Sequence, residues 1–298
     1  MTHLPRRVVV AVCGPLYRIS LDDRRTVTTQ RRLSEASVRL NRVPRGTRVE
    51  HVTLSDRPAE RVTSDAAEGG TAILYLHGGG YVIGSPRMYR AMAAHLARAA
   101  GAPVYTLDYR LAPEHRYPAA LEDATAAFRG LVDLPDVAAN RIAIAGDSAG
   151  GGLAVAAARV LTDAGLRPAA LGLLSPWTDP ADEDMPERDF VVNLAWGRAN
   201  AARYRGGASP TDPGYAPLHG RLDGLPPMLI HCGAQEMLNG QIKRFGALAA
   251  EAGVDVRLVE YPLLWHSGHI LAGMLREASD ATRDLGVFLR AHLEHVSA

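Results

Sequence analysis

The residues at positions 146–150 could carry out nucleophilic acyl transfer. Gly146-Asp147-Ser148-Ala149-Gly150 follows the short apolar run Ile142–Ala145, which is typical of a buried parallel strand. In the pattern G-x-S-x-G the serine lies on a sharp strand-to-helix turn, which exposes its hydroxyl above the sheet. The motif alone is also compatible with an ordinary glycine-rich turn. Ser148 therefore becomes a candidate nucleophile only in the right structural context.

A second glycine-rich segment supplies that context. Thr71–Leu76 reads as another buried strand, and His77-Gly78-Gly79-Gly80-Tyr81 follows it directly. Cleavage of an ester builds negative charge on the carbonyl oxygen, and fixed backbone N–H groups can stabilise that charge. The predicted donors of this oxyanion hole are Gly78, Gly79 and Ala149. His77 is predicted to hold the loop rather than to act as a base.

Alternating strands and helices must position these two loops. Val104–Tyr109 is predicted as a buried strand, with helices over Arg87–Ala100 before it and Pro118–Val132 after it. Val49–Leu54 is predicted as an edge strand. This alternation predicts an α/β fold with a doubly wound, parallel sheet.

These segments resemble the hormone-sensitive-lipase-like α/β-hydrolases, a family that includes many bacterial carboxylesterases. The resemblance rests on HGGGY at 77–81, DYRLAPEHRYPAALED at 108–123, GDSAGG at 147–152 taken with Gly146, and LLSPWTD at 173–179. It covers nearly the whole chain. It implies the α/β-hydrolase fold, with an eight-stranded, mostly parallel sheet flanked by helices and covered by a helical cap.

The fold implies where the catalytic base lies. In α/β-hydrolases the triad runs serine, acid, histidine along the chain, with the histidine in the loop after the last strand. Val256–Tyr261 is predicted to be that strand, and the loop after it contains His266 and His269. The family's pattern places the base first in H-x-x-H, which implies His266. Such a histidine takes the serine proton during attack and returns it to the leaving group.

The triad acid departs from the family pattern. The predicted strand Met228–Gly233 leads into Ala234-Gln235-Glu236, and the family has an aspartate where Gln235 stands. An amide cannot supply the negative charge that stabilises an imidazolium. Glu236 is the carboxylate in that loop and could serve as the acid, although the family often has a glutamate there without a triad role. Both interpretations of Glu236 remain open at the level of sequence.

The chain is predicted to form one domain over residues 1–298, with a cap from about 1–45 and 179–215. Residues 31–40 alternate arginine and apolar side chains at near-helical spacing, and residues 177–224 interrupt the strand–helix rhythm. A long insertion in a compact fold is usually functional or a lid. The candidate pocket walls are Tyr81, Val82, Phe190, Leu194 and Trp196. Core packing explains these side chains about as well.

Composition excludes some partners. With a net charge of +1 and no basic patch with interleaved aromatics, nucleic-acid binding has little support. No run approaches the length of a transmembrane span, and the apolar residues 8–12 are too short for a signal peptide. Cys13 and Cys232 lie far apart without a metal-binding spacing, so a cytoplasmic location and no metal or other cofactor are expected. The sequence does not determine the oligomeric state, and a homodimer stays open.

The predicted function is hydrolysis of small or medium acyl esters through an acyl-enzyme intermediate. Two alternatives stay open, the first of them because of Gln235. The same scaffold can perform eliminations, dehydrations or cyclisations, and some hydrolase-fold proteins are non-catalytic binders of small molecules. The combination of HGGG, Ser148 and His266 argues against a pure binder.

Overall fold

The centre of the molecule is an eight-stranded sheet. The computed structural model describes residues 3–37, 43–65, 69–135 and 137–294. The strand order is β1-β2-β4-β3-β5-β6-β7-β8, and every neighbouring pair from β4 to β8 is parallel. The predicted eight-stranded, mostly parallel sheet is therefore confirmed. The strands are β1 (Thr47–Leu54), β2 (Arg57–Ser64), β3 (Ala72–Leu76), β4 (Val104–Leu107), β5 (Ile142–Asp147), β6 (Leu171–Leu174), β7 (Met228–Gly233) and β8 (Val256–Tyr261).

Two strands, β2 and β6, were absent from the ranges predicted from the sequence. β2 pairs antiparallel with β1 on one side and with β4 on the other. Its sequence, RPAERVTS, contains five charged or hydroxyl side chains and lacks a continuous apolar run. The strand forms because Ala59 and Val62 bury their side chains, while Arg61 pairs with Glu50 across the ladder.

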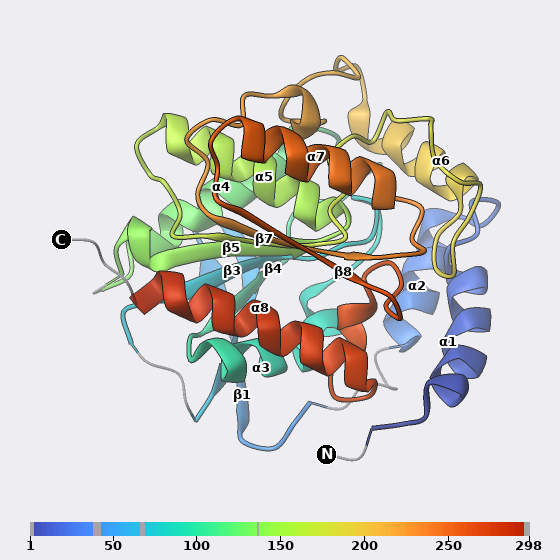
Figure 1. The fold of residues 1–298 in the computed structure, drawn as a ribbon, viewed down its shortest axis with the longest axis horizontal. Helices are drawn as coiled ribbons and strands as arrows, with labels where there is room; N and C mark the ends of the chain where they lie inside the picture. Colours follow the sequence, from blue (N-terminus) through green and yellow to red (C-terminus); the bar gives the residue numbers. More distant parts are fainter. Residues whose placement is uncertain (1–2, 38–42, 66–68, 136, 295–298) are drawn as a thin grey trace.

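Helices cover both faces of the sheet (Figure 1). α3 and α8 lie on one face, and α4, α5 and α7 lie on the other. The predicted helix over Arg87–Ala100 corresponds to α3, which begins with Pro86 at its first position and ends at Gly101 with a left-handed φ of 66°. The helices are α1 (Arg6–Ser20), α2 (Val27–Ser37), α3 (Pro86–Ala100), α4 (Ala119–Val132), α5 (Ala149–Asp163), α6 (Leu194–Arg205), α7 (Asn239–Glu251) and α8 (Arg276–Glu294).

Side chains of the central strands pack into two hydrophobic cores, one on each face of the sheet. Leu74 and Leu76 of β3 point to the core on the α4–α5 side, whereas Ile73 and Tyr75 point to the core under α3 and α8. This alternation follows from the two-residue period of a strand. Because both faces are covered, every residue of β3 to β7 is buried.

α1, α2 and α6 lie together beyond the carboxyl ends of the central strands, at the right of Figure 1. Trp196 of α6 donates its indole N–H to Gln30 of α2 at 2.8 Å. Arg31 of α2 binds the carbonyl oxygens of Val82 and Ala112 and pairs with Glu114. These contacts join α2 to α6 and to the loops after β3 and β4. Within the described residues, no helix is long and apolar enough to cross a membrane.

Candidate active site

Ser148 lies on a strained turn between β5 and α5. Its backbone has φ 51° and ψ −121°, a conformation that L-residues rarely adopt and that persists only where the surroundings enforce it. A Cβ on Gly150 would collide with the carbonyl of Leu76, and one on Gly146 would collide with the carbonyl of Gly150. Glycine is required at both positions because β3, β5 and α5 approach each other so closely. This packing fixes the direction of the serine hydroxyl.

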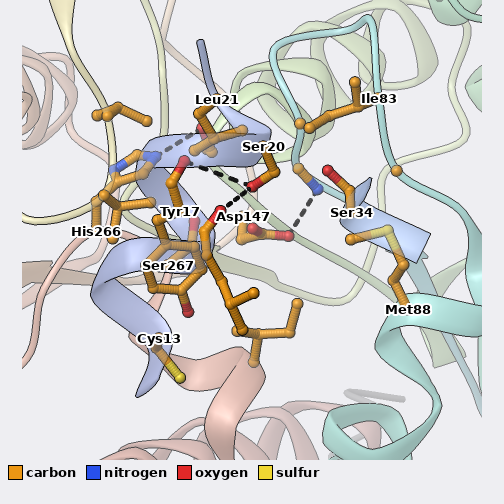
Figure 2. A pocket seen from close by; sticks show the side chains of 18 of the residues that line it. Cys13, Tyr17, Ser20, Leu21, Ser34, Ile83, Met88, Asp147, His266 and Ser267 are labelled. Carbon is orange, nitrogen blue, oxygen red and sulfur yellow. Dashed lines mark hydrogen bonds between the residues drawn. The ribbon is translucent and has the colours of Figure 1, made fainter. Parts of the chain in front are cut away.

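His266 lies beside Ser148. It comes from the loop after β8, and its Nε2 lies 2.8 Å from Ser148 Oγ. Burial lowers the pKa of His266, an effect that the negative charge of Asp189 opposes. A neutral imidazole can accept the serine proton, so the geometry suits a general base. Figure 2 shows His266 at the edge of the cavity, opposite Ile83 and Met88.

Glu236 is the carboxylate that approaches His266 from the other side. Its Oε2 lies 3.8 Å from His266 Nδ1, which is beyond hydrogen-bond distance. Among the described residues, neither His266 Nδ1 nor Glu236 Oε1 has a hydrogen-bond partner. Burial raises the pKa of Glu236 to about 8, and a hydrogen bond from Ser175 partly opposes this. Gln235 is exposed, so the structure brings Glu236 rather than Gln235 to the histidine.

Ser175 holds Glu236 in place, although the sequence analysis did not single it out. Its hydroxyl donates to Glu236 Oε2 at 2.6 Å and accepts from the N–H of Ser267 at 3.2 Å. It follows β6 directly and has a positive φ of 48°. Ser175 thereby links the acid to the residue beside His266. The sequence feature that could have pointed to Ser175 is its position within the LLSPWTD motif.

Asp189 is a second residue that the sequence analysis missed. One carboxylate oxygen accepts from the N–H groups of Val191 and Val192, and the other accepts from the N–H of Met237. Val191 and Val192 line the cavity above Ser148, and Met237 follows Glu236 directly. Asp189 therefore connects the cavity wall to the loop that contains Glu236. Its sequence neighbourhood gave no indication of this, because the contact forms across 48 residues.

The predicted oxyanion hole needs correction at Gly78. Its N–H donates to the carboxylate of Asp147 at 2.8 Å, so it is not available to a substrate. Asp147 also accepts from Tyr75 and Tyr89 at 3.0 Å each, which fixes it beneath the loop. Burial raises the pKa of Asp147. Among the described residues, no acceptor is bound to the N–H groups of Gly79, Gly80 or Ala149.

The other histidines near the site have structural surroundings. His77 is fully buried, stacks on Tyr109 at 4.3 Å between ring centroids, and has its pKa lowered to about 4 by burial. His269 Nε2 lies 3.1 Å from His231 Nδ1, and His231 in turn pairs with Asp284. His269 thus points away from Ser148 and into the α8 side of the fold.

A cavity of about 140 Å³ opens above Ser148. Its wall includes Trp196, as predicted, but the other four predicted residues lie elsewhere. Tyr81 stacks on Tyr204, Val82 is buried in the core, Phe190 packs against Trp265, and Leu194 begins α6. Sequence could not separate these roles, because apolar side chains suit a core and a pocket equally. Cavity-lining residues that the sequence did not single out include Cys13, Tyr17, Ser20, Leu21, Ile83 and Met88.

Comparison with known proteins agrees with this geometry. Residues 73–270 match the family model described as alpha/beta hydrolase fold. An acetyl-hydrolase of Streptomyces hygroscopicus is 42% identical over 80% of this chain and 81% of its own length. The esterase LipU of Mycobacterium tuberculosis is 34% identical over 74% of this chain and 77% of its own length.

Solved structures extend the likeness to the whole fold. The crystal structure of an esterase from the bacterial hormone-sensitive lipase family superimposes with a TM-score of 0.90 and 37% identity. That match covers 97% of this chain and 100% of the other. The chain belongs to the hormone-sensitive-lipase-like family of α/β-hydrolases.

Proposed function

We propose that this protein is a serine carboxylesterase that hydrolyses short or medium acyl esters through an acyl-enzyme. The observation that carries this proposal is the 2.8 Å contact between Ser148 Oγ, on its strained turn, and His266 Nε2. Both groups face a largely apolar cavity. The relatives named esterase and acetyl-hydrolase support the same reaction class.

In the first half-reaction, Ser148 Oγ attacks the ester carbonyl carbon and His266 takes its proton. The negative charge that develops on the carbonyl oxygen is stabilised by the N–H groups of Gly79 and Ala149, joined by Gly80 in place of Gly78. His266 then protonates the leaving alcohol, and the acyl group stays on Ser148. A water molecule, deprotonated by His266, attacks the acyl-enzyme and releases the acid.

Glu236 acts in this mechanism as the acid that stabilises the imidazolium. Its position, 3.8 Å from His266 Nδ1 and braced by Ser175, supports this role. The raised pKa of about 8 means that Glu236 carries its full charge only when a positive charge forms beside it or when the pH is high. Gln235, which stands where the family has aspartate, plays no part because its side chain faces solvent.

The substrates are small esters whose acyl group fits beneath α1, α2 and α6. A cavity of about 140 Å³ resembles in volume the engineered protein cavity of about 150 Å³ that binds benzene. We assign residues from about 1–45 and 179–215 to a cap over this cavity, since side chains from α1, α2 and α6 line it. Residues 1–2 and 38–42 of this cap lie outside the described part of the chain. Both cysteines are free, which is consistent with a cytoplasmic location.

The decisive experiment combines covalent labelling with substitution of the nucleophile. Wild-type protein should react with a fluorophosphonate probe, gain one adduct by intact mass, and hydrolyse p-nitrophenyl esters of short acyl chains. Ser148→Ala should lose both properties. Ester cleavage by purified Ser148→Ala would overturn the acyl-enzyme mechanism, and an unlabelled wild type would favour an elimination or cyclisation on the same scaffold.

A further inference from the structure

Exposed apolar side chains are concentrated on one helix of this protein. Ten large apolar residues are exposed among the described residues, and five of them lie on α1 or directly before it. The other five are spread over separate elements, as single exposed apolar residues commonly are. The α1 outer face consists of Leu4, Val8, Val12, Leu16 and Ile19.

The spacing of these residues makes a continuous stripe. Val8, Val12, Leu16 and Ile19 follow each other at intervals of four, four and three residues, which places them on one side of a helix. They are between 38% and 46% exposed and extend over about 17 Å of helix length. A folded helix normally turns such a stripe toward the core. Here the core-facing positions are instead occupied by Val9 and Cys13, which pack against Trp265 and Leu271.

α1 also forms one wall of the active-site cavity. Cys13, Tyr17 and Ser20 line the cavity from the inner side of the helix, as Figure 2 shows. The outer face is turned about a third of a turn around the helix axis from these residues, and its member Leu16 also lines the cavity, so the stripe reaches the rim of the cavity. Whatever covers the outer face therefore contacts the same helix that lines the cavity.

The charges on α1 indicate what the outer face meets. Arg6 and Arg7 begin the helix, Arg18 lies in its last turn, and the helix contains no acidic residue. Arginine in the first turn opposes the helix dipole, so Arg7 is unfavourable for the isolated helix. Arg6 contacts the Trp265 ring and the carbonyl of Leu263, whereas Arg7 and Arg18 have no ion-pair or hydrogen-bond partner among the described residues.

We propose that the α1 outer face is a docking surface for anionic lipid bilayers. An apolar stripe with cationic ends is the arrangement that lets a helix lie in the headgroup region of an anionic membrane. A second copy of this chain fits less well. Antiparallel pairing of two α1 helices would place Arg7 beside the partner helix's Arg18, and parallel pairing would place like residues together, so both bring positive charges into contact.

Docking places the cap against the apolar phase into which esters of short or medium acyl chains partition. The α1 outer face enters the bilayer surface, while the inner face of the same helix still lines the cavity. Delivery of such esters from the bilayer to Ser148 rests on the proposed esterase function, but docking itself does not. The two can be separated by measuring docking with Ser148→Ala, which lacks the nucleophile.

The test is flotation of the Ser148→Ala protein with vesicles of phosphatidylcholine alone or mixed with phosphatidylglycerol. Binding should require phosphatidylglycerol and weaken as salt is raised. Adding Val8→Ser and Val12→Ser, which lie outside the cavity wall, should weaken binding about tenfold, since two apolar contacts are lost. The matched control is Val160→Ser with Val287→Ser, two valines exposed to a similar degree on α5 and α8, which should bind like the parent protein.

A second pair of variants tests the charges. Arg7→Gln with Arg18→Gln should lower binding to phosphatidylglycerol vesicles about tenfold, whereas Arg129→Gln with Arg276→Gln, on α4 and α8, should not. Equal loss in both pairs would show only a dependence on net charge and would overturn the proposal. So would the absence of binding to both kinds of vesicle. A wild-type dimer in sedimentation velocity that Val8→Ser with Val12→Ser converts to monomer would assign the stripe to a second copy instead.

Discussion

The two halves of the candidate triad are held in place by different means. The nucleophile half is fixed by backbone packing: Ser148 lies on a strained turn whose glycines leave no room for a Cβ, and its contact with His266 is 2.8 Å. The acid half is fixed by side chains: Glu236 lies 3.8 Å from His266 and is braced by the Ser175 hydroxyl. The first half is therefore preorganised, while the second has room to tighten.

The acid half also differs from the nucleophile half in its electrostatics, because Glu236 is a buried carboxyl group. Glu236 is fully buried with one carboxylate oxygen lacking a partner among the described residues, and its pKa is raised to about 8. An unpaired buried acid is costly in its charged form. The cost falls when a positive imidazolium forms 3.8 Å away, so the acid half is better suited to the transition state than to the resting enzyme.

The largest effects are expected in the nucleophile half. His266→Ala should lower turnover of a short-chain ester by about 10⁵- to 10⁶-fold, because nucleophile and base act as one unit. His269→Ala is the matched control, since His269 contacts His231 and not Ser148. It should lower the melting temperature with turnover nearly unchanged. The reverse ranking of the two variants in steady-state rates would contradict the assignment of the base.

Substitution of Glu236 should lower turnover by one or two orders of magnitude less than substitution of His266. Glu236→Gln should lower turnover by about 10³- to 10⁴-fold, by analogy with amide replacement of a triad carboxylate. Gln235→Asp should change turnover little, because that side chain is exposed. Steady-state rates of both variants on one ester decide the matter. A large gain in turnover from Gln235→Asp would mean that the acid of the triad acts from position 235 and not from Glu236.

Sequence predicted the two halves with unequal success, for a physical reason. The strand–glycine–serine pattern and the histidine after the last strand are local features, and the structure brings Ser148 and His266 together as these features predict. Ser175, which donates to Glu236, follows β6, and Asp189, which accepts from the neighbouring Met237, lies before α6, so no local pattern contains them. Ser175 and Asp189 become visible only once the chain has folded.

The glycine loop at 77–81 also contains a tertiary contact that the local sequence could not predict. Three consecutive glycines look alike in the sequence, yet the N–H of Gly78 is taken by Asp147. That contact depends on the register between β3 and β5, which places Leu76 beside Gly146 and thus the two loops side by side. The alternation of strands and helices predicted an α/β fold and the family resemblance implied its hydrolase topology, whereas the donor assignment required tertiary structure.

Removing the brace of the acid should give a smaller but measurable loss. Ser175→Ala deletes the hydroxyl that donates to Glu236 and that lowers its pKa, so the acid should become harder to ionise. We expect a fall in turnover of about 10- to 100-fold at neutral pH, the usual value of a hydrogen bond to a charged group. Part of the loss should be recovered at higher pH. Ser175→Gly also lacks the hydroxyl but relieves the strain of the positive φ, and its turnover should fall as far as that of Ser175→Ala. Full activity of Ser175→Gly would mean that backbone strain in Ser175→Ala, and not the lost hydrogen bond, causes the fall in turnover.

The smallest effect is expected at Asp189, where the cavity wall meets the acid half. Asp189→Asn keeps an oxygen for the N–H groups of Val191 and Val192 but offers an NH₂ group, which cannot accept from Met237. It also removes a negative charge that raises the pKa of His266. The pKa of the base should therefore fall, and the acidic limb of the pH–rate profile should move to lower pH by a few tenths of a unit.

Because the valine wall is retained, KM should stay nearly constant while kcat falls about threefold to tenfold as the acid loop loosens. Asp184→Asn provides the control, since it makes the same change of charge at an exposed position of the same segment. It should leave both the profile and kcat unchanged. A raised KM with an unshifted profile would mean that Asp189 shapes only the cavity, and the acid half would then be held by Ser175 without help from the segment before α6.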